Sequence, residues 1–204
     1  MNRDGLRVGP VRLEGQLVVL EPLRPEHHDG LVTAVQDGEL WRLWYTTIPA
    51  PGEIASEIER RLQLQELGQM VPFTARRRSD HSIIGMTSYM NIDQQLPRVE
   101  IGSTWNAASA HGTGTNTESK LLLLAHAFEE LGCPAVELRT HWLNAQSRAA
   151  IERLGARLDG ILRSHTRAKD GTLRDTCVYS IVQSEWPAVR SGLEYRLRRH
   201  RSSP

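Results

Sequence analysis

A glycine-rich stretch, His111-Gly-Thr-Gly-Thr-Asn116, stands directly before a run of leucines that begins at Leu121. A short glycine-rich turn that leads into an amphipathic helix leaves a row of backbone N–H groups free at the positive end of the helix dipole. Free N–H groups in that place bind anions such as the phosphates of a nucleotide. The sequence therefore predicts an anion-binding loop at residues 111–116.

The spacing of this loop excludes two common phosphate-binding motifs. A nucleoside-triphosphate P-loop needs a glycine, four intervening residues and then Gly-Lys-Ser/Thr. The glycines here are followed by Thr-Asn-Thr-Glu, and Lys120 comes too late. A dinucleotide fingerprint needs a third glycine where Thr117 stands, and it follows a buried strand rather than a polar, alanine-rich segment. An ordinary glycine-rich turn, supported by a capping box from Thr115 to Glu118, stays open as the alternative.

The loop resembles the pyrophosphate loop of the GNAT acyltransferases, in which the pattern Gln/Arg-x-x-Gly-x-Gly/Ala opens a helix. It departs from that pattern twice, because His111 replaces the first Gln or Arg and Asn116 replaces the last Gly or Ala. Three other segments show the family's spacing: Arg98-Val-Glu-Ile-Gly-Ser-Thr-Trp105, Asn144-x-x-Ser147 and Leu154-Gly-Ala156. The resemblance covers about residues 14 to 187 and looks most like the RimJ/RimL-type group, which acetylates protein N-termini or small amines.

The expected order of elements agrees with this resemblance. Apolar periodicity predicts the order β-α-α-β-β-β-α-β-α-β-β. The expected strands are 17–21, 73–78, 82–90, 98–105 and 136–140, the helices begin at about 25, 51, 117 and 144, and a closing hairpin spans 156–183. The resemblance implies an α+β, three-layer fold with a central mixed, mostly antiparallel sheet, two splayed strands and flanking helices. We expect a loose N-terminal arm at residues 1–13, one N-acetyltransferase domain at 14–187 and a basic C-terminal tail at 188–204.

The resemblance also implies that acetyl-CoA is the co-substrate. The N–H groups from Gly112 to Asn116 would meet its pyrophosphate, and its pantetheine arm would lie between the backbones of residues 101–105 and 138–141. Because His111 stands where the family has a permanent cation, it would make cofactor binding depend on pH near neutrality. The expected cofactor-binding residues are Ile101, Ser103, Thr104, Trp105, His111, Gly112, Thr113, Gly114, Thr115, Asn116, Asn144 and Ser147.

Acetyl transfer to an amine requires an unprotonated amine and a stabilised leaving thiolate. Glu100 is the expected general base, because strand alternation separates it from its apolar neighbours and places it beside the splay. Ser147 is the expected general acid, because it lies in the first turn of the helix that Asn144 caps. Tyr89 and Tyr179 are weaker candidates for the acid, and purely structural roles for Glu100 and Ser147 are the alternatives.

The aromatic cluster Trp41, Trp44 and Tyr45 is the expected wall of the acceptor cleft, with core packing as the alternative. Such loops vary freely on one fold, so the acceptor stays open between a protein N-terminus, a polyamine and an antibiotic amine.

The composition of the chain further restricts the class of protein. A chain of 204 residues with 24% charged and 39% hydrophobic residues is typical of a cytoplasmic globular protein, and it contains neither a membrane-spanning run nor a signal-peptide core. Cys133 and Cys177 lack ligand spacing, as do the scattered histidines, so we expect buried cysteines and no metal.

The C-terminal end is arginine-rich, with Arg196, Arg198, Arg199 and Arg201 close together. We expect a solvated, partly disordered end. An RNA-rich or acidic partner for it stays open, and the arm and tail leave room for a homodimer. No other basic stripe with interleaved aromatics exists, which argues against nucleic acid as a partner. The sequence thus predicts an acetyl-CoA-dependent N-acetyltransferase acting by direct attack in a ternary complex. An acyl-CoA-binding module without turnover is the alternative.

Overall fold

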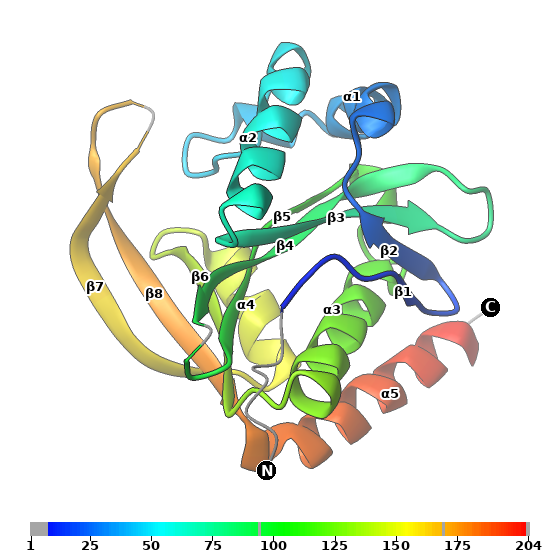
Figure 1. Ribbon diagram of the computed structural model, residues 1–204, viewed down its shortest axis with the longest axis vertical. Helices are drawn as coiled ribbons and strands as arrows, with labels where there is room; N and C mark the ends of the chain where they lie inside the picture. The colour runs from blue at the N-terminus through cyan, green and yellow to red at the C-terminus, as the bar shows by residue number, and fades with distance from the viewer. Residues whose placement is uncertain (1–7, 94, 169, 203–204) are drawn as a thin grey trace.

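The computed structural model describes residues 8–93, 95–168 and 170–202 (Figure 1). Eight strands form one sheet in the spatial order β1-β2-β3-β4-β5-β6-β8-β7. All neighbouring strands are antiparallel except β5 and β6, which are parallel. The strands are β1 (Leu13–Glu14), β2 (Val18–Pro22), β3 (Met70–Arg77), β4 (Ile83–Asp93), β5 (Arg98–Asn106), β6 (Ala135–His141), β7 (Arg157–Arg167) and β8 (Leu173–Val182).

Helices cover both faces of this sheet (Figure 1). The helices on one face are α1 (His28–Gln36) and α2 (Ile54–Glu66), and those on the other are α3 (Thr115–Ala125), α4 (Ala145–Leu154) and α5 (Trp186–Ser202). The predicted fold class, a central mixed sheet flanked by helices, is therefore confirmed. The predicted order of elements is also observed, with β1 and α5 added at the ends.

Each face of the sheet has its own hydrophobic core, and a bulge in β5 changes the face toward which the following side chains of that strand point. Ile101 and Trp105 lie four positions apart and would share a face in a regular strand. Ile101 nevertheless packs with the α3 side, and Trp105 packs with α1 and α2. The pairing with β4 explains this difference, because Met86 opposes Trp105 while Ser88 opposes Gly102, which leaves one extra residue in β5.

The prediction of a loose N-terminal arm is wrong for its described part. Val8 is buried, Val11 packs against the α3-side core, and β1 pairs with β2. Residues 1–7 of the expected arm lie outside the described residues.

The prediction of a partly disordered tail is also wrong. The segment forms α5, in which Leu193 and Leu197 are buried and Trp186 stacks on Phe128 with ring centroids 5.3 Å apart. Trp186, Val189, Leu193 and Leu197 recur at helical spacing, so the signal was present in the sequence. The arginines between them obscured it, because charge clusters at chain ends usually indicate solvated tails.

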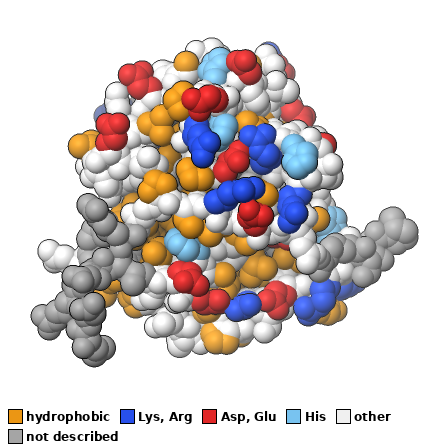
Figure 2. Space-filling view, turned by 45° about the vertical axis from the view of Figure 1, so that its right-hand side comes forward, with side chains coloured by type: hydrophobic (Ala, Val, Ile, Leu, Met, Phe, Trp, Pro, Cys, Tyr) orange, Lys and Arg blue, Asp and Glu red, His pale blue; other side chains and the backbone are white. Residues whose placement is uncertain are grey.

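The surface carries mixed charge. Figure 2 shows one face on which basic, acidic and histidine side chains are interspersed among apolar ones. Cys133 and Cys177 are both buried and unpaired, as expected. No helix in the described ranges is long and apolar enough to cross a membrane.

Candidate active site

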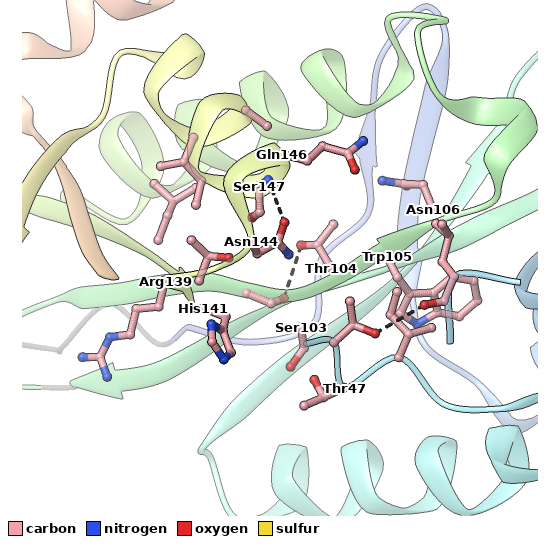
Figure 3. Close-up of a pocket in the computed structure, with 18 of the residues that line it drawn as sticks. Thr47, Ser103, Thr104, Trp105, Asn106, Arg139, His141, Asn144, Gln146 and Ser147 are labelled. Carbon is pink, nitrogen blue, oxygen red and sulfur yellow. Dashed lines mark hydrogen bonds between the residues drawn. The ribbon is translucent and has the colours of Figure 1, made fainter. Parts of the chain in front are cut away.

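A cleft opens where β5 and β6 separate. The two strands pair only at Val99–Val136 and Glu100–Glu137. Beyond these positions a cavity of about 510 Å³ lies between them (Figure 3), and residues 101–106 and 138–141 line it. This geometry confirms the predicted splay. Strand edges without a partner present backbone N–H and C=O groups to an extended ligand.

The bulge in β5 sits on this cleft and is held by a buried arginine. Ser103 adopts a φ of 48°, in the left-handed region. Arg61 from α2 donates through Nη2 to the Ser103 carbonyl (3.0 Å), through Nη1 to Ser88 Oγ (3.0 Å) and through Nε to Glu57 (2.6 Å). Its side chain is 3% exposed. A fixed network of this kind holds the cleft-lining backbone in place.

The glycine turn for which anion binding is predicted leads into α3 beside this cleft, and His111 and Asn116 line the cavity. Gly112 and Gly114 have φ values of 73° and 84°, and Gly114 is the N-cap of α3. The hydroxyls of Thr113 and Thr115 donate to the Ala110 carbonyl at 2.7 and 3.3 Å, which fixes the turn. The first N–H groups of α3 therefore point out of the helix toward the turn, as an anion site requires.

Glu118 does not form the predicted capping box with Thr115. Its carboxylate instead accepts hydrogen bonds from the backbone N–H groups of Gln16, Leu17 and Val18 at 3.0, 2.6 and 2.9 Å. The capping-box prediction is wrong because the hydrogen-bond donors to this carboxylate come from a segment about one hundred residues away in the sequence. Glu118 thus joins the start of β2 to the helix that carries the loop.

Lys120 lies at the bottom of the cleft and was not predicted as a site residue. It is 6% exposed, and its Nζ donates to Thr104 Oγ1 at 2.9 Å and to Thr87 Oγ1 at 3.4 Å. Burial lowers the pKa of Lys120 to about 7. The α3 side of the cleft therefore contains an amine that titrates near neutrality.

The N-terminus of α4 faces the same cleft. The Asn144 side chain accepts a hydrogen bond from the Ser147 backbone N–H at 3.0 Å, which is the predicted cap. Asn144, Gln146 and Ser147 all line the cavity (Figure 3). The positive end of a helix and a hydroxyl thus lie together at this part of the cleft, where they could stabilise a developing negative charge.

Glu100 lies under the opposite side of the cleft. It is 7% exposed, accepts a hydrogen bond from Asn91 Nδ2 at 2.7 Å and lies 3.4 Å from Arg139 Nε. Burial raises its pKa, and Arg139 only partly offsets this. Glu100 does not itself line the cavity, whereas Gly102 does. The Glu100 carboxylate lies directly beside Gly102, since a Cβ added to that glycine would lie 2.7 Å from Glu100 Oε1.

The structure removes both alternative acids. The Tyr89 hydroxyl is buried and donates to the Leu123 carbonyl at 2.6 Å, while the Tyr179 hydroxyl donates to Glu152 at 3.0 Å. Neither tyrosine lines the cavity.

The aromatic cluster divides between core and cleft. Trp41 packs against the α1/α2 core, and Tyr45 lines the cavity. Trp44 is 56% exposed and meets the His141 ring edge-on at 5.7 Å. His141 lines the cavity, and its Nδ1 accepts from the Leu143 N–H at 2.9 Å, which places the proton of the neutral ring on Nε2.

A second cavity of about 310 Å³ adjoins the outer side of the loop. Gly112, Gly114 and Asn116 line it together with Arg153 of α4 and Arg196 and His200 of α5. The basic end of the chain thus lies beside the glycine turn, which no local pattern indicated. Among the described residues, no group of three or more His, Cys, Asp or Glu side chains is arranged to hold a metal.

Comparisons with known proteins agree with this geometry. The family model described as "Acetyltransferase (GNAT) domain" matches residues 18–157. YdaF of Bacillus subtilis (strain 168), whose name describes it as a candidate ribosomal N-acetyltransferase, is 36% identical over 107 residues. That alignment spans 52% of this chain and 57% of YdaF, so the match covers little more than half of the relative.

Solved structures match over nearly the whole chain. A GCN5-related N-acetyltransferase from Brucella melitensis superposes with a TM-score of 0.83 at 28% identity, covering 94% of this chain and 87% of that one. A protein from T. thermophilus, described as a candidate acetyltransferase, gives 0.80 at 32% identity, covering 92% and 97%. Mycobacterium smegmatis RimJ, solved with CoA-disulfide, gives 0.74 at 23% identity over 92% and 93%, which shows the shared fold.

Proposed function

Because the chain belongs to the GNAT acetyltransferase family, we propose that it transfers the acetyl group of acetyl-CoA to a primary amine by direct attack within a ternary complex. One observation carries this proposal. One cleft is lined by His111 and Asn116 at the two ends of the glycine loop, by the separated edges of β5 and β6, and by the capped N-terminus of α4. A long ligand with phosphates at one end and a reactive group at the other fits this shape.

The residues of the cleft suit acetyl-CoA, which supplies the acyl group as an activated thioester. The free N–H groups after Gly114 would hold the pyrophosphate, with Arg153 and Arg196 beside them. Space around Gly112 is open, since an added Cβ would meet no atom within 4 Å. The backbones of residues 101–105 and 138–141 would bind the amides of the pantetheine arm.

Glu100 is the proposed general base. The attacking nitrogen must lose its proton before the C–N bond forms, and a carboxylate with a raised pKa accepts that proton more readily near neutrality. The missing side chain at Gly102 lets the carboxylate approach the cleft, directly or through one water molecule.

Ser147 is the proposed general acid. As the C–S bond breaks, its hydroxyl gives a proton to the departing thiolate and regains one from solvent. The N-terminal dipole of α4 stabilises the negative charge on sulfur in the meantime. The cap from Asn144 keeps this first turn in place.

The acceptor is a primary amine, either a protein N-terminus or a small molecule. The fold shared with RimJ and RimL, and the name of YdaF, support a protein N-terminus. It would enter the part of the cleft that Tyr45 and His141 line, beside the exposed ring of Trp44, which contacts both of their rings.

The proposal is tested by measuring release of CoA thiol from acetyl-CoA with N-terminal peptides, polyamines and aminoglycosides. We expect thiol release with at least one of these classes. Heat of acetyl-CoA binding without any acetyl transfer across the panel would instead favour a binding module.

Two substitutions test the assigned roles. Ser147→Ala and Glu100→Gln should each lower kcat by about 10²- to 10⁴-fold, the usual contribution of acid–base catalysis, with acetyl-CoA affinity kept. Glu137→Gln is the matched control, because it changes another carboxylate that pairs with Arg139. Equal losses in Glu100→Gln and Glu137→Gln would show that the Arg139 ion pairs, not a base, are being measured.

A further inference from the structure

The arginines that line the cleft are paired with carboxylates, with one exception. Arg60 and Arg61 both contact Glu57, at 2.8 and 2.6 Å. Arg139 contacts Glu137 at 2.8 Å and Glu100 at 3.4 Å. Among the described residues, Arg174 of β8 lines the same cavity without any carboxylate partner.

Arg174 is half-buried in this position. Its Nε is shielded from solvent and has no hydrogen-bond partner among the described residues. Burial lowers the pKa of its guanidinium, and no neighbouring carboxylate offsets that effect. Burying part of a guanidinium without a neighbouring anion costs free energy of folding. An anionic group that binds in the cavity would neutralise this charge and offset that cost.

Arg174 and the glycine loop at residues 111–116 lie on opposite faces of the sheet. Thr176 pairs directly with His141, so their side chains lie on the same face of the sheet. Arg174 lies two residues before Thr176 on β8, and its side chain therefore lies on that face too. The His141 ring contacts Trp44, which belongs to the segment between α1 and α2. Arg174 therefore faces the α1/α2 side, one strand beyond β6, whereas residues 111–116 lead into α3 on the opposite face.

We propose that Arg174 binds a carboxylate carried by the acceptor amine, so that the enzyme selects acceptors with an anionic group near the reacting nitrogen. The guanidinium presents a planar pair of donors that matches a carboxylate. His141, with its proton on Nε2, is a second donor on the same side. This inference rests on the proposed acetyltransferase activity, because it assigns the acceptor half of that cleft.

The experiment compares two matched acceptor pairs: an N-terminal peptide with Asp or Asn as its second residue, and an α-amino acid or its amide. Arg174→Gln should lower kcat/KM for the carboxylate member by about 10- to 100-fold, as expected for a lost charge-assisted hydrogen bond, and change the amide member less than about 2-fold. Arg174→Lys should recover part of the loss. Arg157→Gln, an exposed arginine on β7, is the control and should change neither.

Several outcomes would overturn the proposal. Equal losses for both members of a pair would assign Arg174 a structural role, and a raised Kd for acetyl-CoA in Arg174→Gln would assign it to a cofactor anion. If the wild-type chain releases no thiol with any acceptor, the proposed function fails, and the site is then judged by calorimetry of the CoA-bound chain. Heat with the amino acid but not its amide, lost in Arg174→Gln, would still support the anion site, and identical heats would contradict it.

Discussion

The two sides of the cleft differ in the kind of group that lines them. On the α3/α4 side, the groups that line the cleft include backbone N–H groups and helix ends from two short segments, 111–116 and 144–147. On the α1/α2 side, they are the side chains of Arg61, Arg139 and Arg174, carried by α2, β6 and β8. The first kind of site depends on local spacing, and the second depends on which distant strands pair. Under the proposed function, the backbone side would bind the cofactor that the family shares, and the side-chain side would be free to select an acceptor.

The largest effect should follow from removing Arg61. Arg61→Met leaves Glu57 without its buried partner and the Ser103 carbonyl without its donor, so we expect about 3 to 5 kcal/mol of destabilisation. Urea unfolding measures this change. Arg60→Met is the matched control, because Arg60 contacts the same Glu57 but its side chain is 50% exposed, and it should cost less than about 1 kcal/mol. Similar losses in the two variants would contradict a special role for the buried network.

Lys120 should make the stability of the folded chain depend on pH. The unfolded chain keeps the lysine proton up to about pH 10.5, whereas the folded chain releases it near pH 7. Between these values the unfolded state binds more protons, so stability should rise with pH across this window. Below about pH 7 the cost of burying the charged amine is present in full.

The variant Lys120→Met isolates this contribution. It should be more stable than the wild type at pH 6, where the buried amine is charged, and the difference should shrink by an amount on the order of a few kcal/mol toward pH 10. Thermal unfolding of both chains across this range measures it. Parallel pH profiles for the two proteins would show that Lys120 stays charged when folded.

The same contrast explains what could be read from the sequence. The loop at 111–116 and the Asn144 cap follow from spacing within a few residues, and both were predicted. Arg61 was missed because it lies on the apolar stripe between Ile58 and Leu62, where it resembles an ordinary polar helix residue. Its partners on β4 and β5 become neighbours only through strand pairing. Glu118 was misassigned for the same reason, since its real partners lie at the start of β2.

A glycine substitution tests how tightly the backbone side is built. Gly114→Ala forces alanine into φ 84° and brings its Cβ within 2.5 Å of His200 and 3.1 Å of Leu17. A cost of about 1 to 2 kcal/mol from the left-handed backbone alone should shift the loop and raise the acetyl-CoA Kd about tenfold. Gly132→Ala is the control, because Gly132 has φ 63° and open space around it. Calorimetry should find its affinity unchanged, and an equal loss there would mean that strain acts globally.

The smallest effect should come from the C-terminal helix, which places Arg196 beside the loop although the residue is far away in sequence. Arg196 is exposed and donates to the Arg153 carbonyl, so its charge acts on a phosphate through solvent. Arg196→Gln should therefore raise the acetyl-CoA Kd only about 3-fold, and the difference should fade at high salt, where exposed charges are screened. Arg198→Gln, exposed on the same helix but outside that cavity, should leave the Kd unchanged. If both variants weaken binding equally, α5 contributes only net charge; if Arg196 alone does, even the backbone side uses one side chain that no local pattern indicates.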